Sequence, residues 1–162
     1  NPFYRQARLG RHGRVFRIWK LRTMVVDADA RLEAYLARNP AARAEWDATQ
    51  KLKHDPRITI VGRFLRKTSL DELPQLINVL TGQMSLVGPR PMMVNQRHLY
   101  DGDSYYHLRP GLTGLWQVSG RNDCRFVDRV RYDNTYAARI SFLTDLGVML
   151  RTVGVVLRGT GY

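Results

Sequence analysis

Two runs of β-favouring residues near the amino terminus are separated by residues 10–13, which read Gly-Arg-His-Gly. A connection with glycine at both ends permits a tight reversal of the chain, because glycine adopts backbone conformations that other residues avoid. The flanking residues 3–9 and 14–21 include Val15 and Trp19, which favour extended backbone. We therefore predict an amino-terminal β-hairpin whose outward side chains are mostly arginine.

Most of the remaining chain has the pattern of helices. Residues 27–38 and 41–52 are predicted to form two helices, because an Asn-Pro pair interrupts an otherwise helical pattern between them. Both helices are rich in charge, so we expect them to be mostly solvent-facing and to carry no chemistry. Residues 73–80 are predicted to form a further helix that ends at Gly82.

The carboxyl-terminal part, residues 126–157, is also predicted to be mostly helical. Apolar residues recur there at helical spacing and make a broad stripe with arginines around it. The stripe consists of Phe142, Leu143, Leu146, Met149, Leu150, Val153, Val156 and Leu157. Packing into the core is the default interpretation, and contact of an amphipathic helix with a membrane surface is the alternative. Together these patterns predict a predominantly helical α+β fold, with a single domain over residues 1–162.

The charge of the chain points to an anionic partner. The chain has 26 Lys and Arg residues against 14 Asp and Glu residues, which gives a formal net charge of +12 at pH 7. Nucleic acid, an acidic membrane surface and phosphorylated substrates all suit such an excess of cations. No apolar run approaches the ~18 residues of a membrane span. The single Cys124, which we expect to be a small and partly buried side chain, excludes an intrachain disulfide, and the four scattered histidines lack the spacing of a zinc site.

Two adjacent acids, Asp71 and Glu72, stand out in this basic chain. They lie at residues 68–76, which read Thr-Ser-Leu-Asp-Glu-Leu-Pro-Gln-Leu. Ser69 and Glu72 have the spacing of a capping box, which indicates a structural role at a helix amino terminus. Pro74 opposes that interpretation, because it would be the fifth helical residue, where its missing N–H breaks an intrahelical bond. A helix that begins near Asp71 avoids this conflict.

A catalytic role is the alternative for this pair of acids. Arg63, Arg66 and Lys67 come directly before the pair, and cations close to carboxylates keep the carboxylates ionised. An ionised aspartate beside positive charge can hold Mg²⁺ or attack phosphorus. On this local pattern alone, the structural and the catalytic interpretations both stay open.

Four long segments of the chain, taken in order, match one family of enzymes. They are RQARLGRHGRVFRIWKLRTM (residues 5–24), DPRITIVGRFLRKTSLDELPQLINVLTGQMSLVGPRP (55–91), RPGLTGLWQVSGR (109–121) and YDNTYAARISFLTDLGVMLRTVGVVLRGTGY (132–162). The chain resembles the bacterial sugar transferases, which are monotopic polyprenyl-phosphate phosphoglycosyl transferases that begin exopolysaccharide or glycan assembly. The resemblance covers essentially the whole chain.

The resemblance implies a fold in which helices surround a phosphate site made of carboxylates and arginines. It implies that Asp71 and Glu72 are catalytic, with Asp71 as the nucleophile that attacks the β-phosphate of a UDP-sugar. UMP then leaves, and a polyprenyl phosphate (undecaprenyl phosphate) takes the sugar phosphate from Asp71. Glu72 is expected to orient the site and to manage a proton on the acceptor phosphate. Mg²⁺ is the implied cofactor, with Asp71 as its ligand.

The resemblance also implies that four cations bind the phosphates of the substrates. Arg66 matches a phosphate-contacting arginine of the family, and Lys20, Arg90 and Arg121 lie in matching motifs with less defined roles. Arginine suits this task, because its planar guanidinium binds phosphate through two hydrogen bonds. Asp133 also lies in a matching segment, with no implied role.

Family members carry a hydrophobic segment upstream of the first motif, and this sequence does not include one. We therefore expect the chain to be the catalytic domain of a longer membrane protein, at the cytoplasmic face of the bacterial inner membrane. The hairpin and the carboxyl-terminal helix would then rest on the anionic leaflet. The rival interpretations are a basic nucleic-acid-binding module and an inert membrane-surface scaffold. The sequence leaves the oligomeric state and the identity of the sugar open.

Overall fold

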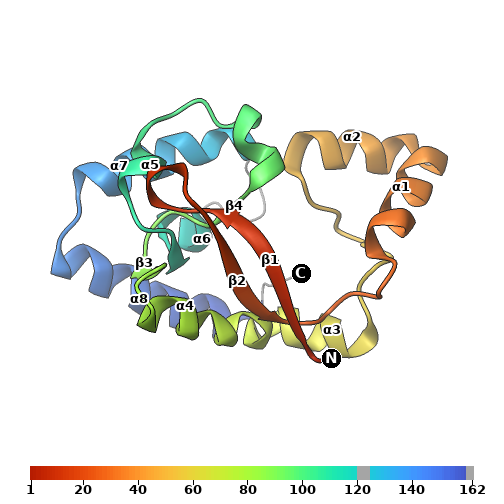
Figure 1. The fold of residues 1–162 in the computed structure, drawn as a ribbon, viewed down its shortest axis with the longest axis horizontal. Helices are drawn as coiled ribbons and strands as arrows, with labels where there is room; N and C mark the ends of the chain where they lie inside the picture. Colours follow the sequence, from red (N-terminus) through yellow and green to blue (C-terminus); the bar gives the residue numbers. More distant parts are fainter. Residues whose placement is uncertain (120–124, 160–162) are drawn as a thin grey trace.

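The amino-terminal part of the chain forms the predicted β-hairpin. The structure, a computed structural model, describes residues 1–119 and 125–159. Strand β1 (Phe3–Leu9) pairs antiparallel with β2 (Val15–Leu21), and a 3-10 turn, η1 (Arg11–Gly13), fills the connection between them. The hairpin is a long ribbon that crosses the molecule, and the amino terminus lies at one end of it (Figure 1).

Three short strands complete the sheets. Strand β4 (Met92–Met93) pairs with the free edge of β1, so the order in this sheet is β2-β1-β4. Strands β3 (Ser85–Val87) and β5 (Gly111–Thr113) form a separate parallel pair. The backbone of β5 approaches the backbone just after β3 closely. A Cβ atom at Gly111 would lie only 2.2 Å from the backbone nitrogen of Gly88. Glycine is therefore required at this contact, which fixes the start of the loop between β3 and β4.

The first two helices form an arm beside the hairpin. They are α1 (Ala28–Arg38) and α2 (Pro40–Thr49), and Asn39 caps α2 by accepting a hydrogen bond from the backbone N–H of Ala42 at 3.1 Å. Helix α2 starts and ends slightly earlier than predicted, because Pro40 takes the first helical position and Gln50 adopts a left-handed conformation. The two helices share an apolar cluster of their own, made of Leu32, Leu36, Ala42 and Leu52.

The segment with the two acids begins as a 3-10 turn and not as a capped α-helix. It comprises η2 (Leu70–Gln75), which continues into α4 (Leu76–Leu80), and it follows α3 (Ile60–Lys67). Ser69 has a left-handed backbone, and its side chain makes no capping hydrogen bond, so the capping-box interpretation is wrong. The tighter 3-10 turn accommodates Pro74 inside the element.

The carboxyl-terminal half is mostly helical, as predicted. Its helical elements are η3 (Val94–Leu99), α5 (Ser104–His107), α6 (Leu115–Ser119), η4 (Phe126–Asp128), α7 (Arg129–Ala138) and α8 (Phe142–Leu157). A first apolar cluster joins this half to the hairpin, and its buried members are Leu9, Met92, Tyr100, Tyr105 and Phe126. A second cluster joins α8 to β3 through Val87, Tyr136 and Val148.

Helix α8 turns most of its apolar stripe to solvent. Among the residues of the stripe, Met149 packs against the second cluster, but most of the others are exposed. The exposed large side chains are Phe142, Leu143, Leu146, Leu150, Val153 and Leu157. Core packing, the default interpretation of this stripe, is therefore wrong for most of it.

The predicted fold class, a predominantly helical α+β fold with an amino-terminal hairpin, is confirmed. In the two described segments of the chain, no helix has the length and apolar character needed to cross a bilayer. The single-domain organisation stays a prediction. Cys124 and Arg121 lie outside the described residues.

A substitution at Gly111 tests the close contact between β5 and the loop after β3. Gly111→Ala is expected to lower the free energy of unfolding by about 1–3 kcal/mol, because the added methyl group meets backbone atoms that cannot move aside easily. Gly147→Ala on α8 is the matched control, since nothing lies within 4 Å of a Cβ atom there. Alanine favours helix over glycine, so this control is expected to be neutral or stabilising by about 0.5–1 kcal/mol. Urea denaturation measures both, and equal effects at the two positions would contradict the prediction.

Candidate active site

The two acids of η2 face inward while the apolar residues of the same turn face outward. Ser69, with φ 57° and ψ 16°, sets the direction of the turn. Asp71 is buried and only 6% exposed, whereas Leu70 and Leu73 are 37% and 51% exposed. A left-handed backbone at a residue other than glycine is uncommon and often occurs at functional sites. The turn therefore places a carboxylate pair under an apolar surface.

Asn78 holds this segment against the hairpin. The side chain of Asn78 is buried on α4, where its Oδ1 accepts a hydrogen bond from the backbone N–H of Trp19 at 3.0 Å. Its Nδ2 donates to the backbone carbonyl of Arg17 at 2.9 Å. Because both partners belong to β2, the amide fixes α4 and η2 relative to the next residue along that strand, Lys20.

Lys20 contacts both acids. Its ammonium nitrogen Nζ lies 2.7 Å from Oε1 of Glu72 and 3.7 Å from Oδ2 of Asp71. Arg90, from the loop between β3 and β4, donates from Nη2 to the same oxygen of Glu72 at 2.8 Å. The structure thus brings together four of the predicted site residues, from three separate parts of the sequence.

The two acids differ in electrostatic environment. Burial would raise the pKa of Glu72, but the charges of Arg90 and Lys20, and the hydrogen bonds from both, hold this pKa well below its usual range. Burial raises the pKa of Asp71, and the charge of Lys20 opposes this rise. Glu72 is therefore a fixed anion in an ion-pair cluster, whereas Asp71 is the less stabilised and more reactive carboxylate.

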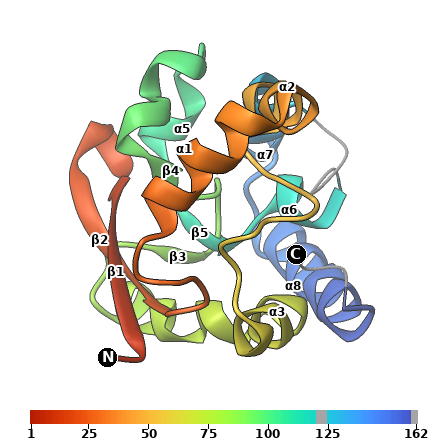
Figure 2. The same ribbon diagram turned by 90° about the vertical axis from the view of Figure 1, so that its right-hand side faces the viewer.

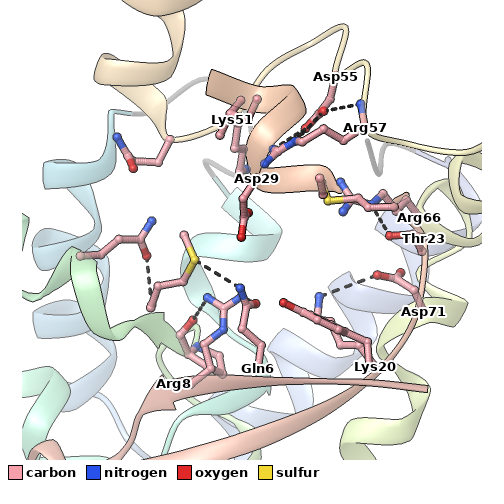
Figure 3. A pocket seen from close by; sticks show the side chains of 18 of the residues that line it. Gln6, Arg8, Lys20, Thr23, Asp29, Lys51, Asp55, Arg57, Arg66 and Asp71 are labelled. Atoms are coloured by element: carbon pink, nitrogen blue, oxygen red, sulfur yellow. Dashed lines mark hydrogen bonds and ion pairs between the residues drawn. The ribbon is translucent and has the colours of Figure 1, made fainter. Parts of the chain in front are cut away.

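Arg66 lies on the other side of Asp71. It extends from α3, and its Nε donates to the hydroxyl of Thr23 at 2.9 Å. Burial lowers the pKa of the Arg66 guanidinium, and the charge of Asp71 opposes this change. Figure 3 shows Arg66, Lys20 and Asp71 around the same side of the cavity. The remaining predicted phosphate-binding residue, Arg121, lies outside the described residues.

These side chains line a cavity of ≈ 870 Å³. A cavity of this size is typical of sites for small molecules and cofactors. Its walls come from the hairpin, from η2, from the β3–β4 loop and from the arm, and Figure 3 shows Asp29 pointing into the cavity from the arm. The two helices are mostly solvent-facing, as expected, and Asp29, Leu32 and Trp46 on their inner side line the cavity.

Arg8 and Thr23 also line the cavity, and the sequence prediction did not include either of them. Strand alternation is the signal that could have identified Arg8. Paired residues of an antiparallel ladder point to the same face, and Tyr4 pairs with Lys20. Side chains an even number of residues apart also share a face, as Tyr4 and Arg8 do. Tyr4, Arg8 and Lys20 therefore share a face of the hairpin. Thr23 carries no such signal, since its role depends on the long-range contact with Arg66.

The fit of the site to Mg²⁺ depends on the substrate. Across residues 1–119 and 125–159, no group of three His, Cys, Asp or Glu side chains is arranged to hold a metal ion. Lys20 and Arg90 already engage one oxygen of Glu72, so Asp71 is the available carboxylate ligand. Mg²⁺ is often bound by one or two carboxylates together with substrate phosphates and water. The residues present therefore fit an ion that binds together with a diphosphate.

The charges around this cavity suit an anionic group, such as a phosphate, bound beside a carboxylate. Arg8, Lys20, Arg66 and Arg90 place more positive charge around the cleft than Asp71 and Glu72 neutralise. A diphosphate would offset this excess, and an anionic carboxylate at 3.7 Å from an ammonium group is positioned to act on phosphorus.

Comparison with known proteins gives a match over nearly the whole chain. The family model described as "Bacterial sugar transferase" matches residues 1–159. The chain is 52% identical over 162 residues to a "UDP-galactose-lipid carrier transferase" of Erwinia amylovora (99% of this chain, 34% of that protein). It is 52% identical over 160 residues to an "Undecaprenyl-phosphate galactose phosphotransferase" of Salmonella typhimurium (98% and 34%). It is also 47% identical over 161 residues to the "Exopolysaccharide production protein ExoY" of Sinorhizobium fredii (98% and 71%).

A substitution at Lys20 tests the electrostatics of the pair. Lys20→Met removes the cation that most strongly lowers the pKa of Asp71, so this pKa is expected to rise further. Titration of the Asp71 side-chain carboxyl carbon by NMR measures the change. Lys67→Met, at an exposed lysine of α3, is the matched control and is expected to leave the Asp71 titration unchanged. An Asp71 pKa that is unchanged or lower in Lys20→Met would contradict the assignment.

Proposed function

Since the chain belongs to the bacterial sugar transferase family, we propose that it moves a sugar 1-phosphate from a UDP-sugar to a polyprenyl phosphate. The observation that carries this proposal is the position of Asp71 beside Lys20 and Arg66 in a cavity of suitable size. The chain spans about a third of the length of the two relatives with 52% identity, and the donor and the acceptor in their names support the proposal. UDP-galactose is the first donor to test, because both of those names include galactose.

In the proposed first step, an oxygen of Asp71 attacks the β-phosphorus of the UDP-sugar. A bond forms between the carboxylate oxygen and phosphorus, and the bond from phosphorus to the bridging oxygen of UMP breaks. Asp71 then carries the sugar phosphate, and UMP leaves with the bond electrons. Lys20 and Arg66 would stabilise the charge on the phosphate oxygens as it moves toward the leaving group.

In the proposed second step, the phosphate of the polyprenyl acceptor attacks the same phosphorus. The new phosphorus–oxygen bond yields polyprenyl diphosphate sugar, and the carboxylate of Asp71 is released for the next cycle. One phosphoanhydride is exchanged for another, so no further energy source is needed. The expected role of Glu72 as a base for a proton on the acceptor phosphate is not favoured, because Lys20 and Arg90 hold the pKa of this carboxyl well below its usual range. We propose that Glu72 orients these two cations instead.

Mg²⁺ is proposed as the cofactor, with Asp71 as its protein ligand. When bound, it would neutralise charge on the diphosphate of the donor. The residues of the chain would hold the rest of the donor: Arg66 and Lys20 lie on the Asp71 side, and Arg90 lies beside Glu72.

The exposed apolar residues support a location at a membrane surface. Figures 1 and 2 both show α3 and α8 toward the same lower side of the molecule, and α4 lies at that side in Figure 1. The exposed apolar side chains of these elements and of η2 include Ile60, Val61, Phe64, Leu73, Ile77, Leu80, Phe142, Leu143, Leu150 and Leu157. Exposed cations on α3 and α8 would favour an anionic leaflet, so we propose that this surface rests on the cytoplasmic face of the inner membrane.

The rival interpretations have less support. A nucleic-acid-binding module presents its cations on an open face, whereas Lys20, Arg66 and Arg90 converge with two carboxylates in a cleft. An inert scaffold has no need of a buried acid with a raised pKa such as Asp71.

A substitution at Asp71 tests the proposed nucleophile. Incubation of the chain with Mg²⁺ and UDP-galactose is expected to add the mass of one sugar phosphate to the protein and to release UMP. Asp71→Asn is expected to show no adduct and no UMP above background. Burial raises the pKa of Asp71 in the folded chain. The ionised carboxylate therefore lowers stability at any pH above the pKa that this group has in the unfolded chain. The Asn variant is therefore expected to be at least as stable as the parent at pH 7. Intact-protein mass spectrometry and thermal unfolding measure these outcomes.

UMP release at the parent rate by Asp71→Asn would exclude Asp71 as the nucleophile. Asp29→Asn is the matched control, since Asp29 lines the same cavity on the arm and has no proposed role in the chemistry. This control is expected to form the adduct.

A double substitution on α8 tests the proposed membrane surface. Phe142→Asp combined with Leu150→Asp is expected to weaken binding to vesicles that contain anionic phospholipid by about tenfold or more, because two exposed apolar side chains lose their contact with lipid. Co-sedimentation with the vesicles measures binding. Val127→Asp is the control, because Val127 is 50% exposed but lies on η4, outside these helices. Equal weakening by the control would contradict the assigned surface.

A further inference from the structure

The loop that carries Arg90 has prolines on both sides of this residue. Pro89 and Pro91 have no backbone N–H, so neither can donate to a neighbouring strand. The loop is instead held through its carbonyl groups. The N–H of Gly111 donates to the carbonyl of Pro89 at 2.8 Å, and a side chain outside the loop donates to the carbonyl of Arg90 itself.

That side chain is Arg129, the first residue of α7. Its Nη2 donates to the carbonyl oxygen of Arg90, and the residue is only 4% exposed. The guanidinium lies over the rings of Trp116 and Phe126, with its central carbon 5.1 Å and 5.0 Å from their centroids. Aromatic faces on two neighbours and a carbonyl at its end leave this cation little freedom to move.

Asp133 supplies the charge that compensates this buried cation. It lies one helical turn after Arg129, is 3% exposed, and accepts a hydrogen bond from the hydroxyl of Tyr100 at 2.8 Å. Burial lowers the pKa of Arg129, and the charge of Asp133 opposes this change. A buried cation without a compensating charge is strongly destabilising. The side chains of Tyr100 and Asp133 therefore help to keep Arg129 charged at the carbonyl of Arg90.

We propose that Arg129 and Asp133 are positioning residues for the sugar-phosphate transfer, and that they act through Arg90. Arg129 fixes the backbone of Arg90, and the guanidinium of Arg90 reaches Glu72 at 2.8 Å beside Asp71. A shift of this backbone moves a phosphate-binding group relative to the reacting atoms, and misplacement of about 1 Å can cost about a hundredfold in rate. The proposal rests on the function proposed above, because the reaction is the one assigned there.

A double-mutant cycle separates this role from a general structural one. Asp133→Asn is expected to lower kcat for UMP release at saturating UDP-galactose about tenfold in the parent chain. In an Arg90→Ala background the same substitution is expected to change kcat less than twofold, because the residue through which it acts is gone. An equal fold-change in both backgrounds overturns the proposal. Tyr100→Phe is the milder variant if Asp133→Asn does not fold, and it is expected to act in the same direction.

A second tyrosine–aspartate pair provides the matched control. The hydroxyl of Tyr136 donates to Asp145 at 2.8 Å, between α7 and α8, and lies 3.4 Å from the carbonyl of Val87 at the end of β3. This pair therefore reaches the strand before the loop and not the carbonyl of Arg90, which Arg129 holds. Asp145→Asn is expected to lower the melting temperature and to change kcat less than twofold. A tenfold loss of kcat in this variant would show that any such pair matters equally, which overturns the proposal.

Hydrogen exchange gives a readout that needs no activity. The N–H groups of Gly88 and Met92 flank the loop and donate at 3.0 Å to the carbonyl of Thr113 and the hydroxyl of Tyr105. Exchange at both groups is expected to be at least about tenfold faster in Asp133→Asn. In Asp145→Asn, exchange at Met92 is expected to be unchanged; Gly88 is not used for this control, because Tyr136, the partner of Asp145, contacts the adjoining carbonyl of Val87. If the parent chain releases no UMP from any UDP-sugar, the proposed function fails, and exchange alone decides the positioning role. Unchanged exchange in Asp133→Asn overturns that role.

Discussion

The ion-pair cluster around Glu72 is the contact on which the rest of the site depends. Glu72 accepts hydrogen bonds from Lys20 of the hairpin and from Arg90 of the β3–β4 loop, so one carboxylate joins three parts of the chain. Buried ions each cost on the order of several kcal/mol in lost hydration, and they are tolerated here because they compensate one another. Glu72 thereby holds the cations in place, while the neighbouring Asp71 keeps a carboxylate that is less stabilised as an anion.

The 3-10 turn η2 combines a polar and an apolar side in one short segment, which suits the two substrates of the proposed reaction. Its acids face the polar cleft, whereas Leu70 and Leu73 face outward among the exposed apolar residues of the neighbouring helices. In the proposed reaction, the lipid acceptor would lie against these apolar side chains while its phosphate enters the cavity that Asp71 lines. The left-handed backbone at Ser69 is the local feature that permits this division.

The sequence predicted the elements whose signals are local. The hairpin followed from its glycine-bounded connection, and the helices of the arm followed from the Asn-Pro pair and the charge pattern. The periodicity of its apolar residues predicted that α8 is amphipathic, but periodicity does not tell whether the apolar stripe packs into the core or is exposed. The roles of Arg129, Thr23 and the arm depend on contacts between distant segments, which neither spacing nor propensity records. The resemblance to a family placed Asp71, Glu72, Lys20, Arg66 and Arg90 in one site, and the structure brings these side chains together around one cavity.

The amide of Asn78 has a consequence for the outer edge of the hairpin. Strand β2 is at the end of its sheet, so its outer N–H and carbonyl groups could pair with a strand of another molecule. Asn78 donates to one of these groups and accepts from another, as a neighbouring strand would. The same side chain that aligns η2 with Lys20 thus occupies part of this edge, which would otherwise be open to strand addition.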